Sequence, residues 1–397
     1  MKNLLFISTC PLPLDQGSSL HAYHFLKALT SYFKVYCIFF VPPHRDKPSY
    51  QDINNLDLNI KDYALCFFTH KNSANKYVQL VRQVFSFPSL FMNSATNSDG
   101  LKEIKNFIQK FSIDIVHVEH FWYAKYIFKI PNCIKKIVVY HDLHHSVFKQ
   151  KAALENKTVS KISLILECFK FYLFEKHLDK QLDVKVFLNA LEMNLLPQNS
   201  VHIPHVIRSD IIFQVRKKTR FFKILFLGSY SHPPNRTSLK FILERLLPNL
   251  VQRTTDFVFH VTGPGTERFS DLVDGFSHRH LVRVDGFKAD INEVFEGMDI
   301  ALFPVLYGGG IKTKVLDAMA AGVPVVTTPQ GISGLIGLPN DCVGLGCTVD
   351  EIVDEIMLLI NSYDLRIERV KNAKNYIEER HSFQAVSDKI YQVYSIL

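Results

Sequence analysis

Long apolar runs are absent from this sequence, which argues against a membrane span. The most apolar stretches, 35–41 and 162–174, are too short or are interrupted by Glu167 and Lys170, whereas a bilayer span needs about 20 apolar residues. The start, Met-Lys-Asn, is followed by a very short apolar run with no small-residue cleavage site. We therefore interpret this segment as leading into a buried first strand rather than as a signal peptide.

Cysteine is sparse, and the motifs of several functional classes are missing. No C-x-x-C pair occurs, which argues against a disulfide framework or structural zinc and favours reduced thiols in a cytoplasm. Residues 11–19 follow the first expected strand without a G-x-G-x-x-G pattern, so a nicotinamide or flavin site is disfavoured. No helix-turn-helix, RNP or zinc-finger pattern and no 20–50-residue repeat is present, and we expect no nucleic-acid partner.

The composition is that of a folded protein with more than one domain. Of 397 residues, 47% are hydrophobic, including 32 Phe and 16 Tyr, which is enough apolar surface for well-packed cores. Charge divides the chain: residues 1–220 hold 29 Lys and Arg against 17 Asp and Glu, and residues 221–397 hold 17 against 21. A basic first half and a mildly acidic second half indicate two domains with different partners.

Short apolar runs alternate with helical patterns, which is typical of parallel α/β units. This alternation is interrupted by a basic connector and then begins again. We therefore expect two doubly wound α/β domains, 1–205 and 221–375, joined by a linker at 206–220. The expected strands are 4–8, 35–41, 64–68, 113–118, 136–140 and 184–188, then 223–227, 256–262, 282–285, 300–304 and 324–328. The main expected helices are 19–32, 97–110, 237–251, 291–297 and 312–321, with further helices from 350 onward.

The most informative segment is G-G-G-I-K-T-K-V-L-D, residues 308–317. Glycines after a strand allow a ligand to approach the backbone closely, and the helix that follows offers free N–H groups and a positive dipole end to phosphate. Lys312 and Lys314 in the first turn add positive charge where the dipole alone would disfavour it, and Asp317 lies about 8 Å further along the axis. The pattern favours a diphosphate site with a carboxylate for ribose over a plain turn with solvated lysines.

This segment, the preceding V-D-G-F-K-A-D from Val284, and the L-G-S and V-T-G-P-G landmarks at 227–229 and 261–265 resemble the donor domain of the retaining group 1 glycosyltransferases. The first half matches less tightly, at D-I-V-H (114–117), Y-H-D-L (140–143) and the loop from Pro11 to Gly17. The resemblance implies a GT-B fold, in which two Rossmann-like parallel-sheet domains face across a cleft. It also implies a C-terminal helix, about 376–397, that packs back onto the first domain.

The resemblance further implies a set of donor-binding positions. They are Gly228, Asn235, Gly263, Phe287, Lys288, Gly309, Gly310, Ile311, Lys312, Lys314 and Asp317. Phe287 and Lys288 are where the nucleobase should rest. The family usually has an E-x7-E pair, but here Gly309 replaces the first Glu and Asp317 the second. The usual Arg and Lys pair after the first donor-domain strand is also missing, and Lys312 and Lys314 could supply that charge instead.

Histidines mark the first domain. His141 follows an expected strand and matches a family position that faces the transferred sugar, where it could donate to a hydroxyl or to developing charge. The resemblance places Gly17, His117, Glu119 and His120 at the acceptor side, although packing roles remain open for them. His141-x-x-His144-His145 does not assemble the three ligands of a catalytic zinc, so we expect no metal.

The implied activity is retaining transfer of a hexose from a nucleotide-diphosphate sugar, the co-substrate, to a saccharide or lipid-linked saccharide in cell-surface polysaccharide or lipopolysaccharide synthesis. The family is thought to react by front-face attack, in which the leaving diphosphate takes the acceptor proton, so a dedicated protein base is not required. No cofactor is expected. A GT-B-fold sugar-nucleotide epimerase and a catalytically silent nucleotide-sugar-binding scaffold are the alternatives.

A basic amphipathic pattern runs through residues 161–182. Such a helix can lie on an anionic membrane, and it can equally be a core helix with exposed lysines. A cytoplasmic protein that is peripheral on the inner face of the plasma membrane would fit the first interpretation.

Overall fold

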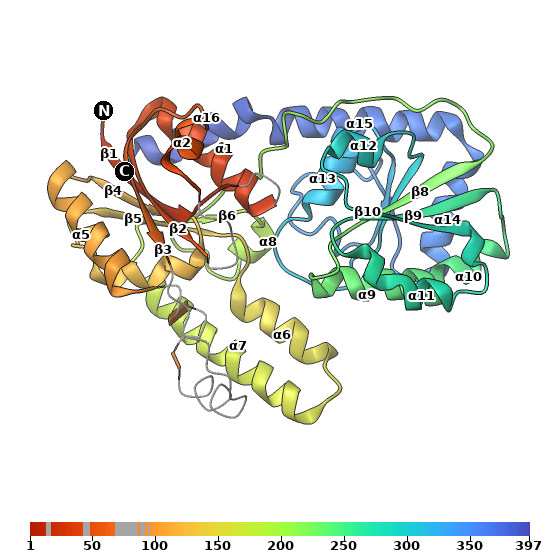
Figure 1. Ribbon diagram of the computed structural model, residues 1–397, viewed down its shortest axis with the longest axis horizontal. Helices are drawn as coiled ribbons and strands as arrows, with labels where there is room; N and C mark the ends of the chain where they lie inside the picture. Colours follow the sequence, from red (N-terminus) through yellow and green to blue (C-terminus); the bar gives the residue numbers. More distant parts are fainter. Residues whose placement is uncertain (13–16, 43–47, 68–85, 88–91, 94–95) are drawn as a thin grey trace. The chain divides into compact units, whose positions relative to one another are not determined.

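The computed structural model describes residues 1–12, 17–42, 48–67, 86–87, 92–93 and 96–397, which form two compact units (Figure 1). Unit 1 comprises Met1–Val206 and Phe383–Leu397, and unit 2 comprises Ile207–Ser382. No helix in the described part of the chain combines the length and the apolar character that a bilayer crossing requires.

Unit 1 contains a seven-stranded sheet in which every pairing is parallel. The strand order is β3-β2-β1-β4-β5-β6-β7. The strands are β1 (Asn3–Thr9), β2 (Lys34–Val41), β3 (Ile60–Phe67), β4 (Ile115–Val118), β5 (Lys135–Tyr140), β6 (Val184–Phe187) and β7 (Ser200–His202). The helices are α1 (Gly17–Tyr32), α2 (Tyr50–Asn54), α5 (Ser98–Phe111), α6 (His144–Leu154), α7 (Thr158–Asp179), α8 (Ala190–Met193) and α16 (Phe383–Ser395), with a 3-10 segment at Phe121–Lys129.

Unit 2 contains a six-stranded sheet, again with only parallel pairings, in the order β10-β9-β8-β11-β12-β13. Its strands are β8 (Phe222–Leu227), β9 (Phe257–Thr262), β10 (Val282–Gly286), β11 (Ile300–Phe303), β12 (Val325–Thr327) and β13 (Gly344–Leu345). Its helices are α9 (Pro233–Phe241), α10 (Leu247–Val251), α11 (Ser270–Asp274), α12 (Ile291–Phe295), α13 (Thr313–Ala320), α14 (Val349–Asn361) and α15 (Tyr363–His381), with a π-helical turn at Ile242–Leu246 and 3-10 turns at Thr266–Phe269 and Arg279–Leu281.

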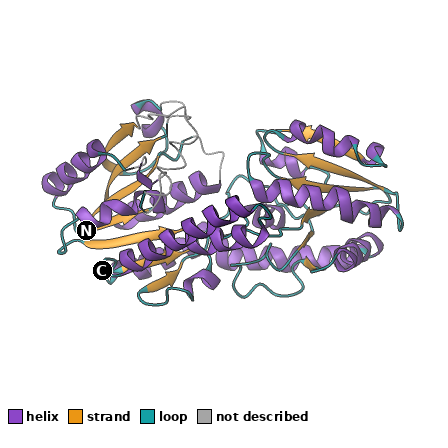
Figure 2. Cartoon of the chain, turned by 90° about the horizontal axis from the view of Figure 1, so that it is seen from below, coloured by secondary structure: helices purple, strands orange, loops and turns teal. Residues whose placement is uncertain are grey.

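Helices cover both faces of each sheet (Figure 2), so the central strands are buried on both sides. β4 and β11 are buried at every position. A strand that is buried on both faces is typical of a parallel sheet, whereas an antiparallel sheet commonly has one solvent-exposed face. Each unit has its own hydrophobic core. The fold is therefore two Rossmann-like α/β units, as the sequence predicted.

The strand order reverses once in each sheet, between β1 and β4 in unit 1 and between β8 and β11 in unit 2. In doubly wound sheets the loops at such a switch point diverge and leave a crevice at the carboxyl ends of the strands. The two switch points are therefore the places where functional side chains should gather.

Several predicted boundaries differ from the structure. The short strands β7 and β13 were not predicted, because two or three residues leave no readable alternation. The helix expected at 237–251 is α9, a π-turn and α10, with Pro248 near the start of α10. Residues 206–220 carry no helix or strand, and all except Val206 belong to unit 2.

At the C-terminus the expected helix at about 376–397 divides at Ser382 into the end of α15 and the whole of α16. Only the part from Phe383 belongs to unit 1, where α16 packs on α1. The expectations for the loop 11–17 and for the strand end at Phe68 fall partly on residues 13–16 and 68, which lie outside the described residues.

Candidate functional site

In unit 1 a cluster of histidines surrounds Glu119 at the switch point of the sheet. β1, β4 and β5 are neighbours, and their carboxyl ends bring Thr9, His117 and Tyr140 to one edge. Glu119 follows β4 and His141 follows β5, so chain direction alone places these two side chains close together.

Glu119 is completely buried and is paired by imidazoles on both carboxylate oxygens. His117 Nε2 lies 2.9 Å from Oε2, and His141 Nε2 lies 3.0 Å from Oε1 and 3.1 Å from the Glu119 carbonyl oxygen. Because His141 Nε2 faces two acceptors, it carries the proton and donates. His21 Nε2, from α1, lies 3.4 Å from Oε1.

The hydrogen bonds continue away from the carboxylate toward α16. His117 donates through Nε2, so its Nδ1 accepts from the Tyr394 hydroxyl at 2.6 Å. His117 and Tyr394 are fully buried. Glu119 thus sets the tautomer of His117, and Tyr394 from the returning C-terminal helix is the partner of its other ring nitrogen.

Burial and charge act in opposite directions on this group. Burial alone would raise the pKa of Glu119, but the hydrogen bonds from His117 and His141 and the charge of His141 hold this pKa well below its ordinary value. Burial would lower the pKa of His141, but the hydrogen bond and the charge of Glu119 raise it above the ordinary value. Burial lowers the pKa of His21 to about 3 despite the attraction of Glu119. The geometry therefore favours an ionised Glu119 beside a readily protonated His141, with His21 neutral.

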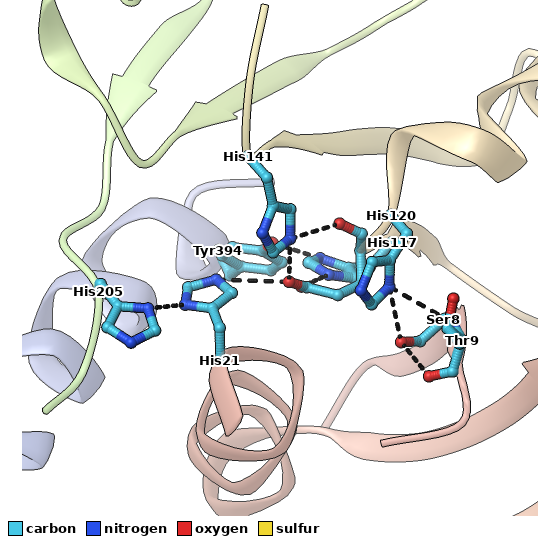
Figure 3. Close-up of polar contacts among 9 residues, drawn as sticks. Ser8, Thr9, His21, His117, His120, His141, His205 and Tyr394 are labelled. Carbon is cyan, nitrogen blue, oxygen red and sulfur yellow. Dashed lines mark hydrogen bonds and ion pairs between the residues drawn. The ribbon is translucent and has the colours of Figure 1, made fainter. Parts of the chain in front are cut away.

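His141 is the member of this cluster that retains exposure, with about 21% of its side chain accessible. Its ring stacks on His120, with centroids 5.1 Å apart and 9° between the planes. His120 Nδ1 accepts from Thr9 N–H at 3.3 Å and lies 3.1 Å from Ser8 Oγ (Figure 3). The strand end of β1 and the ring of His120 thus help to orient His141.

The predicted acceptor-side residues do not all lie where the sequence placed them. For His117 and Glu119 the sequence left open an acceptor-side role and a packing role, and both side chains have no exposed surface, because neighbouring strands and α16 enclose them. They can therefore act only through a partner such as His141. Gly17 is the first residue of α1.

In the described part of the chain, one group of three side chains could hold a metal ion: His21, Glu119 and His141. Their ligand atoms all lie within 4.8 Å of one another, and two nitrogens with one carboxylate oxygen suit a transition metal. The motif His141-x-x-His144-His145 does not form such a group. His144 stacks on Phe121, with centroids 4.6 Å apart, and His145 Nδ1 lies 2.5 Å from Glu175.

In unit 2 the glycine-rich loop lies directly after β11, beside the other switch point. Gly308 (φ 120°) and Gly310 (φ 64°) occupy left-handed backbone conformations that favour glycine. Lys312 Nζ donates to the carbonyl oxygens of Gly308, Gly309 and Gly310 at 3.2, 2.5 and 2.9 Å. Lys312 therefore holds the loop in shape in addition to carrying positive charge.

Lys314, in the first turn of α13, reaches toward the end of β8. Its Nζ donates to Asn235 Oδ1 at 3.0 Å, and Asn235 Nδ2 donates to the Ser229 carbonyl oxygen at 3.1 Å. A Cβ atom on Gly228 would lie 2.7 Å from Asn235 Cγ, and one on Gly263 would lie 2.6 Å from the Gly228 carbonyl oxygen. Four of the predicted donor residues thus pack together, and both glycines are required by this close approach.

Lys314 and Asp317 have shifted pKa values. Burial lowers the pKa of Lys314 to about 7, and Lys312 adds to this. Burial raises the pKa of Asp317 to about 7, although Arg208 opposes the shift. Two titratable groups poised near neutrality on one short helix are characteristic of binding or catalytic sites.

The other predicted donor residues lie in several environments. The Phe287 side chain is 62% exposed, and Lys288 Nζ donates to the Glu293 carbonyl oxygen at 2.9 Å. Ile311 packs partly against the core of unit 2. The Gly309 carbonyl oxygen accepts from Lys312 Nζ.

Sequence reasoning missed four residues at the two sites. His21 and Tyr394 lie far from Glu119 in sequence, and only the packing of α1 and α16 brings them to it. Arg208 lies in the segment read as a linker, and Gln330 Nε2 donates to the Gly308 carbonyl oxygen at 2.6 Å. The basic run at 216–220 marked the connector but gave no signal for Arg208.

Comparisons with known proteins bear on the fold and on the sequence of unit 2. Residues 222–362 match the family "Glycosyl transferases group 1". The whole chain resembles an uncharacterized 44.6 kDa protein in the cps region of Klebsiella pneumoniae, with 23% identity, covering 99% of this chain and 100% of the relative.

Among solved structures, sucrose-phosphate synthase from Thermosynechococcus elongatus aligns with a TM-score of 0.72 and 12% identity, covering 100% of this chain and 99% of that one. Anabaena HepE in complex with UDP aligns with a TM-score of 0.66 and 13% identity, covering 100% of both chains. These likenesses establish the fold. The chain thus has the GT-B fold of glycosyltransferases, and its residues 222–362 carry the sequence match to Glycosyl transferases group 1.

Proposed function

We propose that this protein is a retaining, metal-independent glycosyltransferase. It transfers a hexosyl group from a nucleoside-diphosphate sugar to a saccharide, free or lipid-linked, in the synthesis of a cell-surface polysaccharide or lipopolysaccharide. The observation that carries the proposal is the glycine-rich loop and the start of α13 at the switch point of unit 2, inside the segment that matches the group 1 family. The relative in a cps region supports the polysaccharide assignment.

Donor binding would use the start of α13. The diphosphate would accept hydrogen bonds from backbone N–H groups at the helix start, where the dipole is positive, and Lys312 and Lys314 would balance its charge. Asp317, further along the helix, would accept from a ribose hydroxyl. With two lysines and a dipole present, no metal ion is needed to neutralise the leaving group.

His141 would act on the transferred sugar. Its protonated imidazole, held by Glu119, could donate to a sugar hydroxyl or stabilise the charge that develops as the glycosidic bond breaks. In front-face transfer the leaving diphosphate takes the acceptor proton, so no carboxylate nucleophile or base is required.

The first test is a thermal-shift screen of the purified protein against UDP, GDP, ADP and their common sugar conjugates, with and without EDTA. We expect stabilisation by one base that survives EDTA and is lost in Lys312→Ala. Lys240→Ala, an exposed lysine on α9, is the matched control and should behave like the wild type. The absence of any shift from a folded protein would contradict the donor site.

Donor turnover then separates the candidate activities. A glycosyltransferase consumes the donor faster when an acceptor is added and yields a product that keeps the anomeric configuration of the donor. An epimerase would convert the donor with no acceptor, and a silent scaffold would bind it without turnover. Loss of activity in EDTA would contradict metal independence while leaving transfer intact.

A further inference from the structure

Helices α6 and α7 pack against each other and extend away from the sheet of unit 1 (Figure 1). α7 is 22 residues long, which corresponds to about 33 Å. Its inner face is buried in the core of unit 1 through Phe171, Phe174 and Leu178. The opposite face of α7 is therefore what this helix pair presents outward.

That outer face is unusually apolar for an exposed helix. The exposed fractions of Ile162, Ile165 and Phe169 are 61%, 54% and 57%, and those of Tyr172 and Leu173 are 38% and 41%. The spacing of three, four and three or four residues aligns these side chains on one side of a helix. Together they form an apolar stripe of about three helical turns, which we call the α7 stripe.

The charges around the α7 stripe are of one sign. Residues 144–180, all of which the structure describes, contain seven lysines and four acidic residues. The exposed lysines of this segment are Lys149, Lys157, Lys161, Lys176 and Lys180. At about 100° per residue, Lys176 and Lys180 project within the arc of the stripe, and Lys161 lies at its edge.

The acidic residues of the segment are turned inward or paired. Glu167 is buried and accepts from Lys170 at 3.0 Å, and buried Glu175 pairs with His145. Asp179 pairs with Lys185, and Glu155 is only half-buried. The outward charge of the helix pair is thus contributed by lysines.

We propose that the α7 stripe is a docking surface for an anionic phospholipid bilayer. The helix would lie in the plane of the interface with Ile162, Ile165 and Phe169 among the acyl chains, while the lysines contact lipid phosphates. An apolar face without flanking acidic groups fits a negative surface. It fits a second copy of the same face less well, because the copies would bring lysines against lysines. The proposal goes beyond the transfer activity and does not depend on it.

The test is flotation of the full-length protein with vesicles of phosphatidylcholine alone or mixed with phosphatidylglycerol. We expect binding only to the mixed vesicles, and weaker binding at high salt, because surface charges are screened. The variant Ile162→Ser/Ile165→Ser/Phe169→Ser should bind roughly tenfold more weakly or not at all. Phe221→Ser/Leu358→Ser removes side chains of similar exposure, 52% and 50%, from unit 2 and should bind as the wild type does.

A charge variant tests the electrostatic half of the proposal. Each lysine near an anionic surface strengthens binding roughly fivefold, so Lys161→Glu/Lys176→Glu/Lys180→Glu should abolish flotation with the mixed vesicles. Lys240→Glu in unit 2 is its control. Equal flotation of wild-type protein and both stripe variants would overturn the proposal. It would also be overturned by a wild-type protein that ignores vesicles but forms a dimer that the serine variant dissociates. Because no donor is present, neither result depends on the transferase assignment.

Discussion

Glu119 and His141 form a pair in which a buried side chain controls a more exposed one. The carboxylate raises the pKa of His141, so the imidazole stays protonated to a higher pH than an ordinary histidine. Because Glu119 has no exposed surface, we propose that it acts on a bound sugar only through His141, as a positioning residue. We therefore expect the effect of Glu119 to be seen in the pKa of His141.

Replacing the carboxylate by an amide should therefore move the pH profile. In Glu119→Gln we expect kcat to fall with little change in KM for the donor, and the basic limb of the profile to move to lower pH, because His141 loses the charge that favours its protonated form. Glu192→Gln is the matched control: Glu192 is also a buried carboxylate in unit 1, and it accepts from the Leu143 N–H at 2.7 Å. An unchanged profile in Glu119→Gln would contradict the positioning role.

Lys314 and Asp317 should give nucleotide binding a bell-shaped pH dependence. Diphosphate binding favours protonated Lys314, which is lost as pH rises above about 7, and ribose binding favours ionised Asp317, which is lost as pH falls below about 7. The affinity for the nucleoside diphosphate should therefore be greatest near neutral pH. Calorimetric titration from about pH 5.5 to about pH 8.5 would measure it.

One substitution tests each side of this pH profile. Lys314→Arg keeps a permanent charge and should remove the decline at high pH, and Asp317→Asn should remove the decline at low pH. A profile that is flat in the wild type, or unaltered in both variants, would contradict the assignment of the two groups.

At the scale of elements, the sequence predicted the positions of the strands better than the boundaries of the helices. Ten of the eleven expected strands lie entirely within the described residues, and each coincides with a strand of the structure to within one or two residues. The eleventh, expected at 64–68, corresponds to β3, which begins four residues earlier, at Ile60. Apolar runs between turn residues are strong local signals, and in a parallel sheet their carboxyl ends meet at one edge. For this reason the loops after β4, β5 and β11 could be identified from the sequence as candidate functional sites.

Helix boundaries depended on packing that no local pattern encodes. The π-turn at Ile242–Leu246 divides a helix that the periodicity predicts as continuous, just before Pro248 removes a backbone donor. The break at Ser382 separates two helices that belong to different units. Similarly, residues 161–182 were ambiguous between core and surface helix, and α7 is both: Phe171 and Phe174 are buried while Ile162 and Phe169 are exposed.

On the scale of the whole molecule, the two units have separate hydrophobic cores. A ligand that binds to one unit should therefore stabilise that unit. We expect a nucleoside diphosphate at about 100 times its Kd to stabilise unit 2 by about 2.7 kcal/mol. Hydrogen exchange should then slow in residues 222–362, while β1 and β4 of unit 1 remain unchanged. Slower exchange around Glu119 instead would indicate that the nucleotide binds to unit 1, and would contradict the donor site proposed in unit 2.

The sequence alone was sufficient for the two α/β units, the glycine-rich loop and the lysines and aspartate of α13, because each of these rests on local periodicity or on residues within ten positions of one another. The environment of Glu119 was not accessible in this way. His21, His117, His141 and Tyr394 reach it from α1, β4, the loop after β5 and α16, and the last of these lies 277 residues from His117. A buried charge is stabilised only by the partners that packing brings to it, so its protonation could be read only once the chain was folded.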